Sequence, residues 1–123
     1  MDLEFSAQEQ AFRDDVRAFL SDELPAEIAE AVRTGSELSK SDHERWHAAL
    51  QSRGWLAQTW PAEHGGPGWN AVQRHIFEEE AALANAPRIV PFGLNMLGPV
   101  LIEFGTPEQQ AEYLPRILDG TDW

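Results

Sequence analysis

The chain has 123 residues, with 21 acidic against 9 basic side chains, a net charge of −12 and no cysteine. A length of this order predicts a single domain spanning residues 1–123, and the acidic balance makes nucleic acid and anionic membranes poor partners. The sequence also excludes disulfide scaffolds, thiolate zinc sites and cysteine nucleophiles, because it contains no thiol.

The start of the chain, Met1-Asp2-Leu3-Glu4, has neither a basic nor an apolar region of the kind that a secretory signal requires. The most apolar stretch, Ile89 to Phe104, is shorter than a bilayer span and is interrupted by two prolines and an asparagine. We therefore expect a soluble protein located in the cytoplasm.

Apolar residues recur at helical spacing along most of the chain, and no segment alternates like a half-buried strand. Ser6 with Glu9 forms a capping-box pattern that opens a first helix. Its buried face is expected to consist of Phe12, Val16, Phe19 and Leu20. Pro25 fits the first turn of a short second helix, and Gly35 would end it.

The third expected helix opens at Ser41, which pairs with Glu44 as a second capping box. It would bury Trp46 and Leu50 and stop at Gly54, a residue typical of helix ends. Asn70 with Gln73 then begins a fourth helix that runs to about Asn85. Its apolar face is expected to be Val72, Ile76, Phe77 and Leu83, while at least two of Glu78, Glu79 and Glu80 face solvent.

A fifth helical stretch is expected over residues 92–104, closed by Gly105. Thr106-Pro107-Glu108-Gln109 is a complete start signal for a sixth helix, which should break near Pro115. The fold class is therefore all-α, with about six short helices packed as an orthogonal or up-down bundle.

The fifth stretch is apolar almost all round, with only Asn95 and Glu103 strongly polar. Such a helix has to be covered on every side. It is either a central core helix, or one flank meets another domain or an apolar ligand, and the pattern favours neither. Pro99 removes a donor from this helix, and the resulting kink beside Asn95 is a place where a ligand could bind.

The segment His43-Glu44-Arg45-Trp46-His47 matches the H-E-x-x-H pattern of helical zinc hydrolases. Its Glu44 already serves the expected capping box, which would leave the motif in an exposed first turn. No further histidine follows at the spacing of known zinc families, although a distant third ligand stays open among Glu63, His64, Glu78, Glu79 and Glu80. We keep a zinc hydrolase only as an alternative and assign no metal ligand.

The stretch from Gly54 to Trp69 is rich in glycine, proline and tryptophan. It lacks the lysine of a phosphate-binding P-loop, and no strand precedes it as a dinucleotide fingerprint requires. The glycines and prolines favour a rigid turn, and the tryptophans could instead shape the loop to lie against a ligand or a neighbouring domain.

Four segments, in this order, resemble the amino-terminal helical domain of the acyl-CoA dehydrogenase family. They are Phe5-Ser6-Ala7-Gln8-Glu9-Gln10, the loop Trp60-Pro61-Ala62-Glu63-His64-Gly65-Gly66-Pro67-Gly68, Glu79-Glu80-Ala81-Ala82-Leu83-Ala84, and Phe104-Gly105-Thr106-Pro107-Glu108-Gln109-Gln110 continued by Tyr113-Leu114-Pro115-Arg116-Ile117. The set covers essentially the whole chain, and each segment alone is a weak signal.

The resemblance implies an enzyme in three parts: this helical domain, a flavin-binding β-domain and a carboxy-terminal helical bundle, the last two outside residues 1–123. Such enzymes bind FAD and form an α,β-unsaturated acyl-CoA from a fatty, branched, aromatic or steroid-derived acyl-CoA substrate. They pass electrons to an electron-transfer flavoprotein and are usually homo- or hetero-tetramers. Their catalytic base and most flavin contacts lie in the other two parts, so we expect no catalytic or cofactor-binding residue in this chain, which alone should be inactive and bind no FAD.

The resemblance leaves one wall of the acyl pocket to this domain, in the segment from Pro91 to Val100. The candidate wall residues are Phe92, Asn95, Met96, Leu97 and Pro99. The alternative from a different class is a stand-alone helical interaction module without catalysis.

Overall fold

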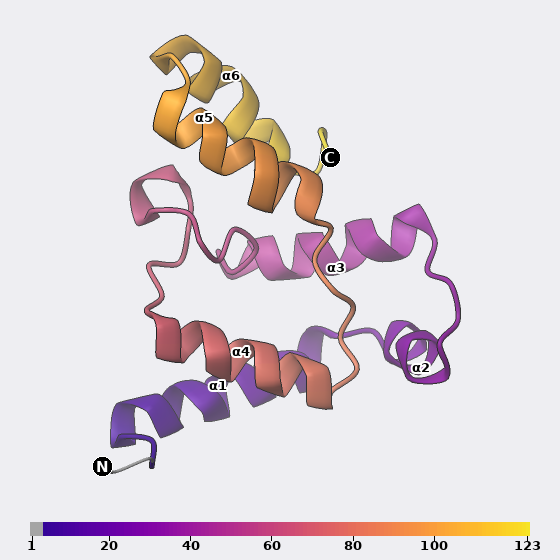
Figure 1. Ribbon diagram of the computed structural model, residues 1–123. Coiled ribbons are helices and arrows are strands. Elements are labelled where there is room, and N and C mark those ends of the chain that lie inside the picture. The colour runs from indigo at the N-terminus through magenta and orange to yellow at the C-terminus, as the bar shows by residue number, and fades with distance from the viewer. Residues whose placement is uncertain (1–3) are drawn as a thin grey trace. The chain divides into compact units, whose positions relative to one another are not determined.

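The computed structural model describes residues 4–123, so the expectation of no secretory signal falls largely on residues outside the described part. Residues 4–123 form α-helices joined by loops, with one 3-10 turn, one π-helix and no strand, which confirms the all-helical fold class (Figure 1). No helix in this part of the chain is long and apolar enough to cross a bilayer.

The helices belong to two compact units. The first contains residues 4–38 and 69–87 and carries α1 (Ala7–Glu23), α2 (Ala26–Thr34) and α4 (Ala71–Leu83). The second contains Ser39–Gly68 and Arg88–Trp123 and carries α3 (Lys40–Ser52), η1 (Ala62–His64), η2 (Phe92–Leu97), α5 (Gly98–Phe104) and α6 (Pro107–Leu118). The expectation that residues 1–123 act as one domain stays a prediction.

In the first unit α1 lies along α4, although the two are far apart in sequence (Figure 1). The Ser6 side chain caps α1 by accepting from the Glu9 backbone, as predicted. The predicted face of α1 is buried at Val16, Phe19 and Leu20. Asn70 and Gln73 form the predicted reciprocal capping box of α4. These start signals hold because each one satisfies backbone donors that a helix leaves unpaired.

The predicted apolar face of α4 is only half right. Ile76 and Phe77 are buried, whereas Val72 and Leu83 are exposed. Helix α4 also ends at Leu83, two residues earlier than expected, and Asn85 takes a left-handed conformation with φ of 59°. Side chains at the two ends of a helix can lie beyond its packing partner even when they share the partner-facing stripe.

In the second unit the start of α3 differs from the prediction. The capping box is formed by Ser39 and Asp42, not by Ser41 and Glu44, so the helix begins at Lys40. Both pairs have the required spacing of three, and the earlier pair adds two residues to the helix. Glu44 is therefore not a capping residue, and its carboxylate lies 3.5 Å from the Lys40 ammonium.

Helix α6 starts at the predicted Thr106–Gln109 capping box but does not break near Pro115. It continues to Leu118, and the Asp119 backbone donates to the Pro115 carbonyl at 3.0 Å. A single proline removes only one helical donor. Leu114 and Ile117 are both buried, so packing on either side of Pro115 holds the last turn in place.

Candidate functional site

The apolar segment before Gly105 is helical as predicted, but its first half, Phe92–Leu97, is a π-helix. Its wider turn is visible in the backbone bonding, because the Gly98 N–H donates to the Gly93 carbonyl, five residues back. Pro99 follows at the start of α5. A proline ring would collide with the carbonyl four residues earlier in a regular α-helix, and a π-turn is one way to relieve that collision.

The π-turn leaves the carbonyl of Leu94 without a helical donor. An α-helix would supply the N–H of residue 98, which is used by Gly93, and a π-helix would supply residue 99, which is a proline. The indole Nε1–H of Trp60 donates to the Leu94 oxygen instead, at 2.7 Å, and this bond is buried. Trp60 thus satisfies a polar group that would otherwise be costly to bury.

Gly98 makes room for that tryptophan. A Cβ atom built on Gly98 would overlap Cζ2 and Cε2 of Trp60, so only a glycine lets the ring come this close to the helix. Gly93 is similarly close to α6, because a Cβ there would lie 3.0 Å from Cγ2 of Ile117. The underside of η2 is therefore packed on its own unit through Gly93, Leu94 and Gly98, all of which are buried.

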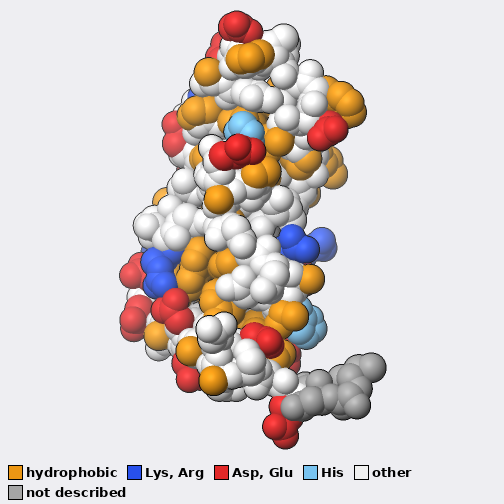
Figure 2. All heavy atoms as spheres, turned by 90° about the vertical axis from the view of Figure 1, so that its left-hand side faces the viewer, with side chains coloured by type: hydrophobic (Ala, Val, Ile, Leu, Met, Phe, Trp, Pro, Cys, Tyr) orange, Lys and Arg blue, Asp and Glu red, His pale blue; other side chains and the backbone are white. Residues whose placement is uncertain are grey.

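The opposite side of the segment is open. Phe92 is 61 % exposed and Phe104 is 80 % exposed. Met96, Leu97 and Val100 are also exposed large apolar side chains. Figure 2 shows orange hydrophobic side chains at the surface of the α5–α6 hairpin, in the upper part of the view.

The sequence left two interpretations of this segment, a central core helix or a helix with one flank against another domain or a ligand. The segment is open on one side, so it is not a fully covered core helix. Of the predicted wall residues, Phe92, Asn95, Met96 and Leu97 are exposed and Pro99 is partly buried. We call the surface formed by Phe92, Met96, Leu97, Val100 and Phe104 the apolar wall. An exposed apolar surface of this kind is suited to contact with a ligand or with another protein surface. The pocket role of the five candidate residues stays a prediction.

The histidine pair of the H-E-x-x-H match lies in a different environment from the one expected. His47 is buried, and its Nε2 accepts a hydrogen bond from the Val90 backbone at 3.2 Å. Burial, with a smaller contribution from the nearby His43, lowers the pKa of His47 to about 4, so the ring is neutral near pH 7. Trp123 stacks on the same ring, with centroids 5.8 Å apart.

The nitrogen that would ligate zinc is thus already used as an acceptor. The described residues contain no group of three potential ligands placed to hold a metal ion. The prediction of an exposed motif was wrong for His47, because the Val90 backbone and the Trp123 ring pack on its imidazole, whereas Glu44 is exposed as expected. The arrangement gives the zinc hydrolase alternative no support.

The glycine-rich loop packs against its own unit. A Cβ atom on Gly66 would overlap the Trp60 carbonyl, and one on Gly65 would lie 2.7 Å from Cδ1 of Leu118. The space beside these glycines is filled by protein, so it cannot serve as a cradle for a pyrophosphate. On this observation the glycine-rich loop does not fit a pyrophosphate. The expectation that this chain holds no cofactor-binding residue stays a prediction.

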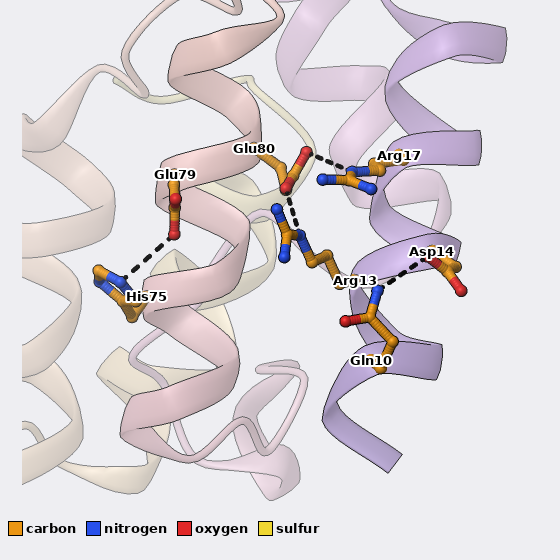
Figure 3. A network of polar contacts seen from close by, with 7 residues as sticks. All are labelled: Gln10, Arg13, Asp14, Arg17, His75, Glu79 and Glu80. Carbon is orange, nitrogen blue, oxygen red and sulfur yellow. Dashed lines mark hydrogen bonds and ion pairs between the residues drawn. The ribbon is translucent and has the colours of Figure 1, made fainter. Parts of the chain in front are cut away.

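One buried group was missed by sequence reasoning. Glu80 is only 5 % exposed, and its two carboxylate oxygens accept from Nε of Arg13 at 2.8 Å and Nε of Arg17 at 2.9 Å. Figure 3 shows both arginines reaching from α1 to Glu80 on α4. The hydrogen bond from Arg17, followed by that from Arg13, outweighs burial and holds the pKa of Glu80 below its usual range.

This ion-pair network joins α1 to α4 within the first unit. A hollow of about 410 Å³ opens beside it, between the end of α1 and α4, and is lined largely by leucine and alanine. The spacing from Arg13 to Arg17 does place both on one face of α1, which is the only sequence signal that could have suggested a shared acidic partner.

Comparison with known proteins gives the family. The sequence model described as "Acyl-CoA dehydrogenase, N-terminal domain" matches residues 6–121. The chain is 42 % identical over 118 residues to acyl-CoA dehydrogenase IpdE1 of Mycolicibacterium smegmatis, covering 92 % of this chain and 30 % of that protein. The chain therefore belongs to the acyl-CoA dehydrogenase family and corresponds to its N-terminal domain, as the four sequence segments indicated.

Solved structures agree with this assignment. The ChsE4–ChsE5 complex from Mycobacterium tuberculosis superposes with a TM-score of 0.77 at 32 % identity, over 98 % of this chain and 30 % of that chain. A protein described as the Tcur3481–Tcur3483 steroid ACAD gives a TM-score of 0.73 at 34 % identity, over 98 % of this chain and 31 % of that one. The chain thus spans about a third or less of the length of the relatives that it matches.

Proposed function

We propose that this chain supplies one wall of the acyl pocket in an FAD-dependent acyl-CoA dehydrogenase that forms an α,β-unsaturated acyl-CoA. The observation that carries the proposal is the apolar wall, whose large side chains are open to solvent while its underside is fixed by Trp60, Gly98 and Ile117. An acyl chain is apolar, so burying it against Phe92, Met96 and Leu97 is favourable.

The cofactor and the reacting groups belong, in this proposal, to a flavin-binding β-domain and a carboxy-terminal helical bundle outside residues 1–123. The loop around Gly66 has no room for a pyrophosphate, and membership of a family whose named members are about three times as long supports further domains. FAD would supply the acceptor for the hydride removed from Cβ of the thioester, and a carboxylate base outside residues 1–123 would take the proton from Cα. The described residues would bind the acyl chain and exclude water from it.

The substrate that we propose is an acyl-CoA with a bulky, steroid-derived acyl group. One of the structural relatives supports this choice, because it is described as a steroid ACAD. The wall also exposes several large apolar side chains that a bulky acyl group could cover. Asn95 is the exposed polar side chain in this segment and could bind an oxygen on the acyl group. A fatty acyl-CoA is the other outcome of the assay below.

The partners that we propose are the remaining domains of the same enzyme, a second subunit in a tetramer, and an electron-transfer flavoprotein. The relatives described as a ChsE4–ChsE5 complex and as Tcur3481–Tcur3483 support assembly with another subunit, because both descriptions name two proteins. The cytoplasmic location expected from the sequence stays a prediction.

The experiment is to read the gene downstream of Trp123 and to express the longest open frame. A frame that continues into a β-domain, a purified protein that carries flavin, and enoyl-CoA formation from a steroid-side-chain acyl-CoA with an artificial electron acceptor would support the proposal. A stop codon directly after Trp123 and a colourless, inactive protein would favour the stand-alone interaction module instead.

A further inference from the structure

We propose that Trp60 is a positioning residue. From the loop packed behind η2 it fixes how far the side chains of the apolar wall project from their unit. The proposal rests on the proposed function wherever it concerns acyl-CoA. Trp60 is 2 % exposed and lies on the hidden side of η2, so it cannot contact an acyl group bound to the open side. Its effect on specificity would therefore be indirect.

The π-turn needs a hydrogen-bond donor from outside the helix. Gly98 donates to Gly93, and Pro99 has no N–H, so the Leu94 carbonyl faces inward without a backbone donor. The Trp60 indole supplies the missing bond at 2.7 Å. Without that donor the buried carbonyl would favour a different turn, because an unsatisfied buried polar group is costly.

Trp60 and Gly98 are in close contact, which a larger residue at position 98 would prevent. The ring of Trp60 occupies the space where any other residue at position 98 would place its Cβ. The bond to Leu94 and the contact with Gly98 therefore hold the helix at two points four residues apart. Phe92, Met96 and Leu97 project from the same short segment. Fixing the segment at these two points therefore also fixes how far the three side chains extend from the unit.

The loop that carries Trp60 is itself well anchored. The Trp60 N–H donates to the Ala57 carbonyl at 3.1 Å, and Ala57 and Leu56 are buried. Gly66 lies directly against the Trp60 carbonyl. The glycine-rich loop thus has a role that sequence reading left open: it presents an indole to the back of the apolar wall.

The first arm of the test measures amide and indole hydrogen exchange in the 123-residue protein. In the unchanged protein the Trp60 indole proton should exchange at least about tenfold more slowly than that of Trp123, because a buried bonded donor is protected and Trp123 is 40 % exposed. Trp60→Phe keeps an aromatic ring but loses the donor, and it should speed exchange of the Gly98 amide about tenfold.

The matched control is Trp55→Phe, which makes the same replacement at another buried tryptophan of the same unit and keeps the Trp60 donor to Leu94. Trp55→Phe should change the exchange rate of the Gly98 amide by no more than its effect on the free energy of global unfolding accounts for. Gly98→Ala should speed the same amide, and it should do so less in a Trp60→Phe background, because the smaller ring leaves room for the new methyl group. Additive effects in this cycle, or an unprotected Trp60 indole, would overturn the proposal.

The second arm uses the full-length protein and compares kcat/KM for a short linear acyl-CoA with that for a ring-bearing one. Trp60→Phe should change the ratio of the two values about tenfold, and Trp55→Phe should leave it unchanged. A ratio that stays constant in Trp60→Phe while Gly98 exchange rises would overturn the positioning role. Absence of turnover in the unchanged enzyme would count against the proposed function, and the exchange data would still decide whether Trp60 fixes the segment.

Discussion

The Nε2 atom of His47 accepts a hydrogen bond from the Val90 backbone N–H at 3.2 Å. The bond links α3 to the residues that lead directly into η2, so it helps to fix the start of the segment that carries the apolar wall. An imidazole can accept only while that nitrogen is unprotonated. The stability of this link therefore depends on pH.

We predict that His47 makes the protein less stable as the pH falls from about 6.5 to about 4. Burial lowers the folded-state pKa to about 4, so in this window the unfolded chain binds a proton that the folded chain does not. The loss amounts to roughly 3 kcal/mol at most and is absent at higher pH.

Urea unfolding of the unchanged protein and of His47→Gln across this pH range isolates the effect. The glutamine oxygen can accept from Val90 but has no proton to bind. The difference between the two stability curves should be flat above pH 6.5 and slope below it. Parallel curves down to pH 4 would show that His47 is not buried as a neutral ring.

Glu80→Gln tests the ion-pair network between α1 and α4. The amide keeps one acceptor but loses the charge that pairs with Arg13 and Arg17, and we expect a loss of about 1–3 kcal/mol in the free energy of unfolding. The range is moderate because both arginines are partly exposed to water. Glu78→Gln on the exposed side of α4 is the control, with an expected change within about 0.5 kcal/mol. Equal effects of the two variants would contradict the network.

Gly66→Ala should be among the most damaging single methyl additions in the protein. The new Cβ would overlap the Trp60 carbonyl, which is backbone and cannot swing away. We expect a loss above about 4 kcal/mol or failure to fold. Gly54→Ala is the control, since a Cβ there meets nothing within 4 Å and only its φ of +71° is unfavourable, at about 1 kcal/mol. Circular dichroism and thermal unfolding distinguish the two cases.

Phe92→Ser and Met96→Ser should leave the stability of the isolated chain nearly unchanged, within about 0.5 kcal/mol, because both side chains are exposed. In the full-length protein the same substitutions should weaken binding of the acyl group. Thermal unfolding of the isolated chain checks the predicted stability, and KM measurements on the full-length enzyme check the predicted loss of acyl binding. A large loss of stability in the isolated chain would mean that the wall is part of the core instead.

The sequence predicted the helices well because their start signals are local. Ser6, Asn70 and Thr106 each cap the helix that they were expected to cap, since the bonds involved lie within three residues. The choice between Ser39 and Ser41 could not be made from spacing, because both serines have an acid three residues later. Pro115 was expected to break α6, and burial of Leu114 and Ile117, which depends on tertiary packing, keeps the helix whole.

The apolar run up to Phe104 indicated a helix in need of cover, and the structure leaves one side of that segment open. The pocket role that the resemblance implies for this segment stays a prediction. The hydrogen bond from Trp60 to the Leu94 carbonyl could not be predicted, because it joins residues 34 positions apart. The same holds for Glu80, whose burial depends on two arginines more than 60 positions away. Long-range contacts of this kind leave no local pattern.

The central claim is that the open side of η2 and α5 lines the pocket for an acyl group. Met96→Trp in the full-length protein tests it most directly, because the bulkier tryptophan side chain at position 96 takes space from the pocket. Val72→Trp is the matched control, since Val72 is an exposed apolar residue of α4. The account predicts that kcat/KM for a ring-bearing acyl-CoA falls at least about tenfold in Met96→Trp and is unchanged in Val72→Trp. Equal kcat/KM in the unchanged protein and both variants would contradict it.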